Sequence, residues 1–72
     1  MVNTQLLDEK IEKSGLKIGF IVDKLGISWN GFNKKRAGKT PFRAAEIYVI
    51  GDLLSLNDAE KDEIFFADKV EP

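Results

Sequence analysis

The sequence predicts an all-α domain built from five short helices. Apolar residues recur at three- and four-residue spacing in successive segments, as they do on the buried face of a helix. Capping residues and glycines separate these segments, and no stretch alternates apolar and polar residues for long enough to predict a strand. Seventy-two residues lie near the lower limit at which one apolar core suffices without disulfides or metals. We therefore expect residues 1–72 to form a single domain.

The first helix is expected over residues 4–14. Asn3 or Thr4 is a suitable N-cap, because a short polar side chain accepts a hydrogen bond from a free amide of the first turn. Gly15 follows the segment and suits the left-handed conformation in which many helices end. The apolar residues of this helix are Leu6, Leu7 and Ile11.

A second and a third helix are expected over residues 17–25 and 29–37, joined by a tight turn. Gly26 ends the second helix, since glycine adopts the left-handed conformation that such a turn demands. Ser28 is a good N-cap for the third helix, and Gly38 closes it. The apolar residues of the second helix are Phe20, Ile21, Val22 and Leu25.

The fourth and fifth helices have the clearest starting signals. Thr40 and Pro41 predict the start of the fourth helix, as a capping hydroxyl followed by proline in the first helical position, and it should run to about Leu54. Asn57 and Glu60 have the spacing of a capping box and predict the start of the fifth. Their apolar residues are Ile47, Ile50 and Leu54 in the fourth helix and Ile64, Phe65 and Phe66 in the fifth.

Composition argues against several classes of function. Cysteine and histidine are both absent, so disulfides, thiol chemistry, the usual general base and the commonest transition-metal ligand are excluded. We expect no enzyme, no cofactor, no metal site and no small-molecule substrate. No apolar run approaches the ~20 residues of a membrane span, and no signal-peptide pattern opens the chain. We therefore expect a cytoplasmic protein that does not contact a membrane.

Charge is unevenly distributed along the chain. Residues 1–27 are neutral, residues 28–45 carry +5 with no acid, and residues 46–72 carry −6, which gives the net charge of −1. Such a chain presents a cationic patch while it repels polyanions elsewhere. Residues 68–72 form a charged tail that we expect to fray.

Residues 18–37 resemble the helix-turn-helix of the lambda-repressor-like (Cro/CI, Xre) family. The resemblance covers about residues 5–66 and includes the loop from Gly38 to Pro41. It implies a compact five-helix domain, and the sequence looks most similar to the small Cro-like and modulator-of-repression (MOR) proteins of temperate phages of Gram-positive bacteria. The matching residues are Ile21 and Leu25 facing inward, Gly26 and Ile27 in the turn, Ser28 as cap and Phe32 as the inward residue of the third helix.

The chain departs from the family pattern at a few positions. Val22 stands where the family prefers a small residue. Lys35 and Arg36 stand where apolar residues commonly anchor the end of the recognition helix. Gly31 lies inside that helix, where glycine costs about 1 kcal/mol relative to alanine. These departures weaken the expectation of tight operator reading more than the expectation of the fold.

The resemblance implies that the third helix reads bases in the major groove of double-stranded operator DNA. Asn30 and Asn33 suit adenine, because an amide can pair with both its N6 donor and its N7 acceptor. Lys34 suits guanine or a phosphate. The alternative is that these side chains only form a solvated helical face. The candidate base-reading residues are Ser28, Trp29, Asn30, Asn33 and Lys34, and the candidate phosphate contacts are Lys17, Lys35, Arg36, Lys39 and Arg43.

Trp29 and several other aromatic residues suggest a contact with a protein instead. Tryptophan has one donor and no acceptor, so it cannot pair with a base edge in two places, whereas an exposed tryptophan among cations is typical of a protein–protein hot spot. Trp29 could equally pack at the rim of the core, and the C-terminal phenylalanines could close the end of the bundle. The candidate protein contacts are Trp29, Phe42, Tyr48, Phe65 and Phe66.

Two functional hypotheses follow from this resemblance. In the first, the chain is a transcriptional regulator of a temperate-phage lysis–lysogeny switch that binds operator DNA, alone or together with the phage repressor. In the second, it is a modulator that binds the repressor protein itself, as co-repressor or antirepressor, with little DNA binding of its own. A homodimer is compatible with both. The antitoxin of a toxin–antitoxin pair is a third candidate with the same fold.

Overall fold

Five helices account for most of residues 2–67, the part of the chain that this computed structural model describes. They confirm the expected all-α class, and no strand occurs in the described part. The Cα radius of gyration of 11.3 Å is that of a compact chain of this length. The expected fraying of residues 68–72 concerns residues outside the described part. The helices are α1 (Thr4–Ser14), α2 (Ile18–Leu25), α3 (Trp29–Arg36), α4 (Ala44–Leu53) and α5 (Asp58–Phe65).

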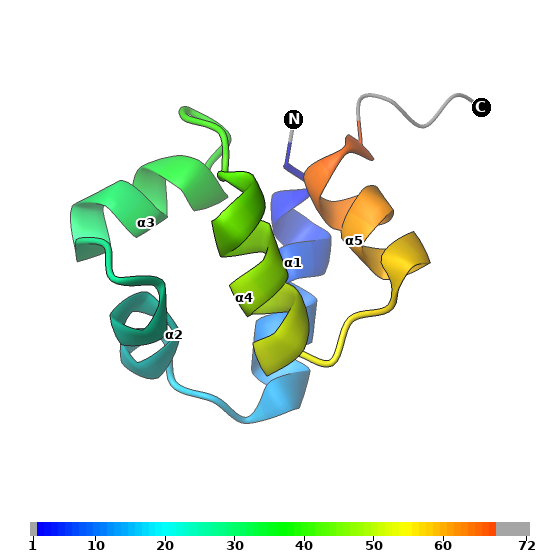
Figure 1. The fold of residues 1–72 in the computed structure, drawn as a ribbon, viewed down its shortest axis with the longest axis horizontal. Helices are drawn as coiled ribbons and strands as arrows, with labels where there is room; N and C mark the ends of the chain where they lie inside the picture. The colour runs from blue at the N-terminus through cyan, green and yellow to red at the C-terminus, as the bar shows by residue number, and fades with distance from the viewer. Residues whose placement is uncertain (1, 68–72) are drawn as a thin grey trace.

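Helix α4 lies in the middle of the molecule. In Figure 1, α2 and α3 lie on one side of it and α5 on the other, with α1 behind. The start of α1 lies beside the end of α5, because the backbone N–H of Asn3 donates to the carbonyl of Ile64 at 2.7 Å. The α2–α3 pair and α5 therefore present different faces of the domain, separated by α4.

Local capping fixes most of the helix ends at the positions that the sequence predicts. The Asn3 side chain accepts from the N–H of Leu6 at 3.1 Å, so Asn3 and not Thr4 caps α1. Gly15 ends α1 in the left-handed conformation, with φ of 73°. In α5, Asn57 Oδ1 accepts from Glu60 N–H at 2.8 Å and Glu60 Oε1 accepts from Asn57 N–H at 2.9 Å. The predicted capping box of α5 is thus confirmed.

The predicted start of α4 at Thr40 and Pro41 is wrong, because the helix begins at Ala44. The side chain of Phe42 enters the core and is only 8% exposed, so the chain stays non-helical until it has passed this residue. Glu46 then accepts a hydrogen bond from the backbone N–H of Arg43 at 2.7 Å and closes the first turn. A tertiary contact has overridden a local starting signal.

A chain of three aromatic rings joins α3, the loop before α4 and α5. The ring of Phe42 meets Phe32 at a centroid distance of 6.3 Å and Phe65 at 5.3 Å, both edge to face, as aromatic pairs prefer. The expectation that Phe42 extends an outer apolar surface is therefore wrong. Phe65 is buried and closes the bundle, Phe66 is partly buried against the core, and Tyr48 is 73% exposed. The buried apolar core consists of Leu7, Ile11, Ile21, Val22, Phe32, Phe42, Ile50, Ile64 and Phe65.

No helix within residues 2–67 has both the length and the apolar character needed to cross a bilayer. The same residues contain no group of three or more acidic side chains arranged to hold a metal ion.

We predict that Phe42→Ala lowers the free energy of unfolding by about 3–5 kcal/mol, the usual loss for a buried phenylalanine. The change removes the ring that touches both Phe32 and Phe65. Urea denaturation followed by circular dichroism measures it. Tyr48→Ala is the matched control, since an exposed ring should change stability by less than about 0.5 kcal/mol. Equal losses for the two variants would contradict the assignment of Phe42 to the core.

Candidate macromolecule-binding surface on α2 and α3

Helices α2 and α3 are joined by the three residues Gly26, Ile27 and Ser28. Gly26 has φ of 69°, and its N–H donates to the carbonyls of Val22 and Asp23, both at 3.1 Å. The Ser28 hydroxyl accepts from the N–H of Gly31 at 3.0 Å and caps α3. Each of these features is encoded locally, and together they hold two short helices against each other across a tight turn.

The buried side of α3 is narrow. Phe32 is its one fully buried residue, so most of the helix surface faces solvent. Ser28 and the outward residues of α3 are exposed, and Asn30 makes no side-chain hydrogen bond within the described chain. The exposed residues on this side are Ser28, Trp29, Asn30, Asn33 and Lys34.

Lys35 turns inward and anchors α3 to α4. Its Nζ lies 2.6 Å from both carboxylate oxygens of Glu46, and the two side chains are only 15% and 10% exposed. A lysine held in this way is not available to a DNA phosphate. The expectation that Lys35 contacts the DNA backbone is therefore corrected: the residue links two helices.

Arg36 is also engaged within the domain. Its guanidinium lies 3.6 Å from Asp8 of α1 and stacks 5.8 Å from the ring centroid of Phe32. Its Nη2 donates to Asn33 Oδ1 at 3.4 Å, and its carbonyl accepts from the Thr4 hydroxyl at 2.5 Å. Arg36 thus ties the end of α3 to α1, which corrects its expected role as a free phosphate contact.

The end of α3 is consequently held by charged residues. Lys35 bonds to α4 and Arg36 to α1. Both are long side chains whose apolar stems can cover the core while their charged ends find partners. Charged side chains therefore anchor the end of α3 at the two positions where the sequence departs from the resemblance.

Glu46 is the acceptor on which the α4 contact depends. Burial raises the pKa of its carboxyl, but the hydrogen bonds from the Arg43 backbone N–H and from Lys35, with the attraction of both cations, outweigh this effect and the pKa lies below its ordinary value. Glu46 therefore remains ionised in mildly acidic solution and keeps Lys35 bound.

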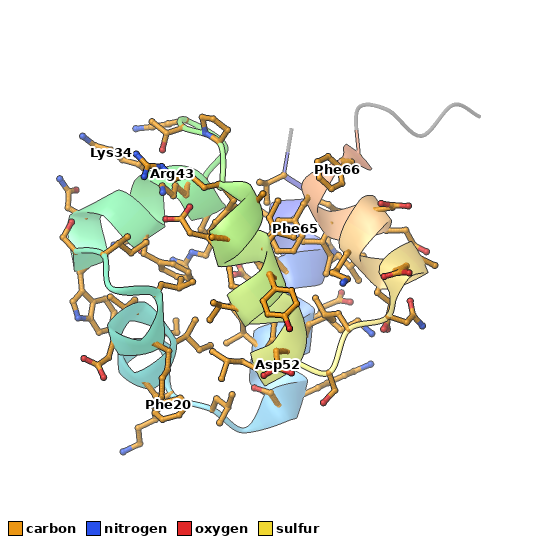
Figure 2. All side chains as sticks on the ribbon, viewed as in Figure 1. Phe20, Lys34, Arg43, Asp52, Phe65 and Phe66 are labelled. Atoms are coloured by element: carbon orange, nitrogen blue, oxygen red, sulfur yellow. The ribbon has the colours of Figure 1, made fainter. Side chains whose placement is uncertain are left out.

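Four of the expected phosphate contacts remain exposed without an ion pair inside the described residues: Lys17, Lys34, Lys39 and Arg43. Arg43 also attracts the Glu46 carboxylate. Lys34 and Arg43 lie at the same edge of the molecule in the view of Figure 2. An open hollow of about 440 Å³ between α1 and α3 brings Lys34 and Lys39 together with the two asparagines of α3, and Asp8 also lines it. The free cationic surface is thus smaller than the charge of residues 28–45 suggests.

Trp29 lies across α2 and leaves much of its ring in solvent. The ring covers Gly19, where an added Cβ would stand 3.3 Å from Cζ2, and the side chain is still 54% exposed. The interpretation of Trp29 as a rim residue is thus correct for one edge of the ring. The rest of the ring remains open to a partner.

Phe20, one of the apolar residues of α2, is exposed. It is 44% exposed, and Lys24 Nζ lies 5.3 Å from its ring centroid. Its neighbours Ile21 and Val22 take the buried positions. Three consecutive apolar residues span about 200° around a helix and cannot share one face, which was the signal that could have identified Phe20 as exposed.

Comparisons with known proteins found no match for this chain. No protein-family model, no curated protein and no solved structure matches the chain.

We predict that Glu46→Gln destabilises the domain at pH 7 by about 1–3 kcal/mol, the range for losing hydrogen bonds to a charged group. Because the folded pKa of Glu46 is lowered, its contribution is present above the unfolded value of about 4.3 and disappears as pH falls through the folded value. Chemical denaturation between pH 7 and pH 3 should show the variant and the parent converging in acid.

Glu63→Gln is the control for this series, because Glu63 is exposed and forms no ion pair among the described residues. Some acid sensitivity should persist in Glu46→Gln, since the hydrogen bond from Lys10 and that from the Asn57 N–H also lower the pKa of Glu60. Parallel stability curves for the Glu46 variant and the parent across this pH range would contradict the proposed anchoring role.

Proposed function

We propose that this chain is a regulator of a temperate-phage genetic switch and that it acts by binding the phage repressor protein. The phage context rests on the resemblance of residues 18–37 to lambda-repressor-like proteins. We name the surface concerned the α2–α3 face and define it by Trp29, Asn30, Asn33 and Lys34. The observation that carries the proposal is the exposure of the large Trp29 side chain there, which is 54% exposed.

The exposed tryptophan favours a protein partner over a stand-alone contact with DNA. Trp29 starts α3, and its ring lies against the α2 backbone at Gly19. Exposed tryptophan next to polar and cationic residues is the composition in which binding energy concentrates at protein interfaces. A single helix in the major groove gains little binding energy from an exposed aromatic ring.

The balance of charge supports the same choice. Lys35 and Arg36 are bound within the domain, so four exposed cations remain of the six among the candidate base-reading and phosphate-contacting residues. The chain as a whole carries −1. Contacts to four phosphates would give a slope of about −3.6 in a plot of log K against log salt concentration, which is modest for a specific DNA-binding protein.

Operator binding through α3, alone or together with the repressor, is the second candidate. The observation that favours it is the set of exposed polar residues on that helix, Asn30, Asn33 and Lys34. An asparagine amide can pair with adenine at two positions, and lysine can reach guanine or a phosphate. A regulator that docks on a repressor already bound to DNA could use the asparagines for bases and Trp29 for the protein.

We predict that Trp29→Ala weakens the complex with the repressor about 30-fold or more, as truncation of an interface hot spot of 2 kcal/mol does. Isothermal titration calorimetry with purified repressor measures the affinity. Glu63→Gln, an exposed residue of α5 on the other side of α4, is the control and should change it less than threefold. In the parent protein, Trp29 is the only tryptophan, so a blue shift of its fluorescence should accompany binding when a repressor without tryptophan is used.

A gel-shift series separates the two candidates. The duplex carries the intergenic region beside the repressor gene. Three samples are run with it: the chain alone, the repressor alone, and the two proteins together. If the chain alone retards the duplex and never retains the repressor, the first proposal fails and the second stands.

We predict for the second candidate that Lys34→Ala lowers the salt slope of DNA binding by about 0.9, the share of one phosphate. Lys35→Ala should leave the salt slope unchanged in the variant molecules that remain folded, because Lys35 faces Glu46. Filter binding at several salt concentrations measures both slopes. A Lys35 variant that loses as much slope as the Lys34 variant would contradict the assignment of the free cations.

A further inference from the structure

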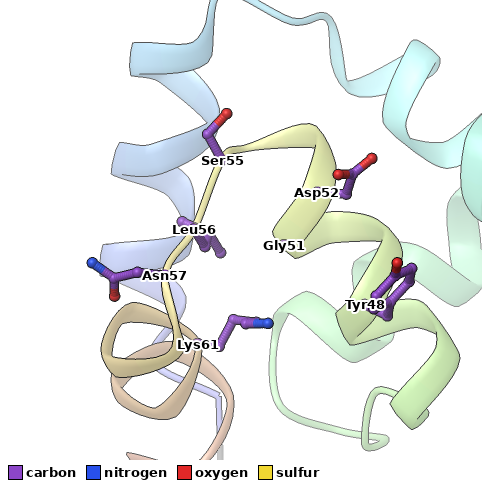
Figure 3. A pocket seen from close by; sticks show the side chains of 7 residues that line it. All are labelled: Tyr48, Gly51, Asp52, Ser55, Leu56, Asn57 and Lys61. Carbon is purple, nitrogen blue, oxygen red and sulfur yellow. The ribbon is translucent and has the colours of Figure 1, made fainter.

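The domain has a second concave region, between α4 and α5, which we name the α4–α5 hollow. It has a volume of about 390 Å³ and is lined by Tyr48 and Asp52 from α4, Ser55 from the corner between the helices, and Lys61 from α5, among others (Figure 3). Helix α5 lies on the opposite side of α4 from α2 and α3 (Figure 1). The hollow is therefore a region that the α2–α3 proposal does not use.

Gly51 and Lys61 together shape the floor of the hollow. A Cβ at Gly51 would stand 2.9 Å from Lys61 Cδ, so the stem of the lysine lies in the space that a side chain would take. Lys61 Nζ lies 3.3 Å from Asp58 Oδ1, which pairs the cation of the hollow within α5. Ser55, with φ of 55°, takes a left-handed conformation that is uncommon for a residue with a side chain, and it turns the chain sharply after α4.

Tyr48 and Asp52 stand one turn apart on α4 at the edge of the hollow. Tyr48 is the most exposed large apolar side chain of the described residues, at 73%, and Asp52 is exposed and forms no ion pair among them. Figure 3 shows both side chains projecting from the same side of α4. Residues at this spacing are neighbours on a helix surface, so one ligand group can touch both.

We propose that the α4–α5 hollow binds an arginine side chain from a basic segment of a partner protein. A guanidinium is planar, so it can stack on the Tyr48 ring and direct two parallel N–H groups at the Asp52 carboxylate. Lysine offers a compact point charge and cannot do both in one plane. An aromatic face beside an unpaired carboxylate is therefore selective for arginine.

The charge around the hollow selects the class of partner. Asp52 of α4 and Asp62 and Glu63 of α5 are exposed acids that form no ion pair among the described residues, whereas Asp58 pairs with Lys61. This potential attracts a basic protein segment and repels a nucleic acid backbone. The proposal does not depend on the partner of the α2–α3 face, because it uses other residues on another side of α4.

The test uses the full chain labelled with ¹⁵N and two synthetic peptides of equal charge. The first is Ac-Ala-Lys-Arg-Lys-Ala-NH₂, and the second has lysine in place of the arginine. Amide signals of residues 48–56 should shift with the arginine peptide, which should bind about two- to fivefold more tightly than the lysine peptide, the range for an exposed cation–π contact. Equal affinity for the two peptides would overturn the proposal.

Matched variants separate the specific contact from general attraction. Tyr48→Leu keeps an apolar side chain but removes the ring face, and Asp52→Asn removes the carboxylate, so each should abolish the preference for the arginine peptide. Asp62→Asn removes the same charge from α5 and should preserve it. The proposal fails if Asp62→Asn and Asp52→Asn have equal effects, or if a DNA duplex shifts residues 48–56 as the arginine peptide does. All three positions changed are exposed, and circular dichroism verifies that each variant is folded.

Discussion

The ring of Phe42 holds the two halves of this domain together. It lies between Phe32 of α3 and Phe65 of α5 and comes from neither helix, so one loop residue links elements more than 30 positions apart in the chain. Because Phe32 is the one fully buried residue of α3, the position of that helix depends on this contact. The same burial delays the start of α4 to Ala44 and so places Glu46 where it can reach α3.

The second constraint on α3 is electrostatic. Lys35 meets Glu46 and Arg36 meets Asp8, which anchors the helix to α4 and α1 through charged groups. The Lys35–Glu46 pair lies at low exposure, and its short charge-assisted hydrogen bonds are directional, so it helps to fix the orientation of the helix. The consequence for function is a loss of free cations, since two of the five positive charges in residues 28–45 point into the domain. The surface that remains combines aromatic and amide groups with few charges, which suits a protein partner better than a bare phosphate backbone.

The two candidate interfaces lie on opposite sides of α4. The α2–α3 face presents Trp29 with exposed lysines nearby, and the α4–α5 hollow presents Tyr48 with an acidic surround. A small domain with this separation of charge has a marked dipole, and a dipole orients the molecule as it approaches a charged partner. In the proposed regulator, α4 is the shared support of these two surfaces.

The sequence by itself determined the helical class, the tight turn between α2 and α3, and the ends of most helices. These features depend on groups a few residues apart, as in the left-handed Gly26 and the Asn57 capping box. Short sequence patterns therefore predict them. It also placed Asn30 on an exposed face. Only the tertiary structure decided that Phe42 enters the core and that Lys35 turns inward. Both depend on contacts across ten or more positions, where the free energy of burying a ring or pairing a charge exceeds the local preference of the chain.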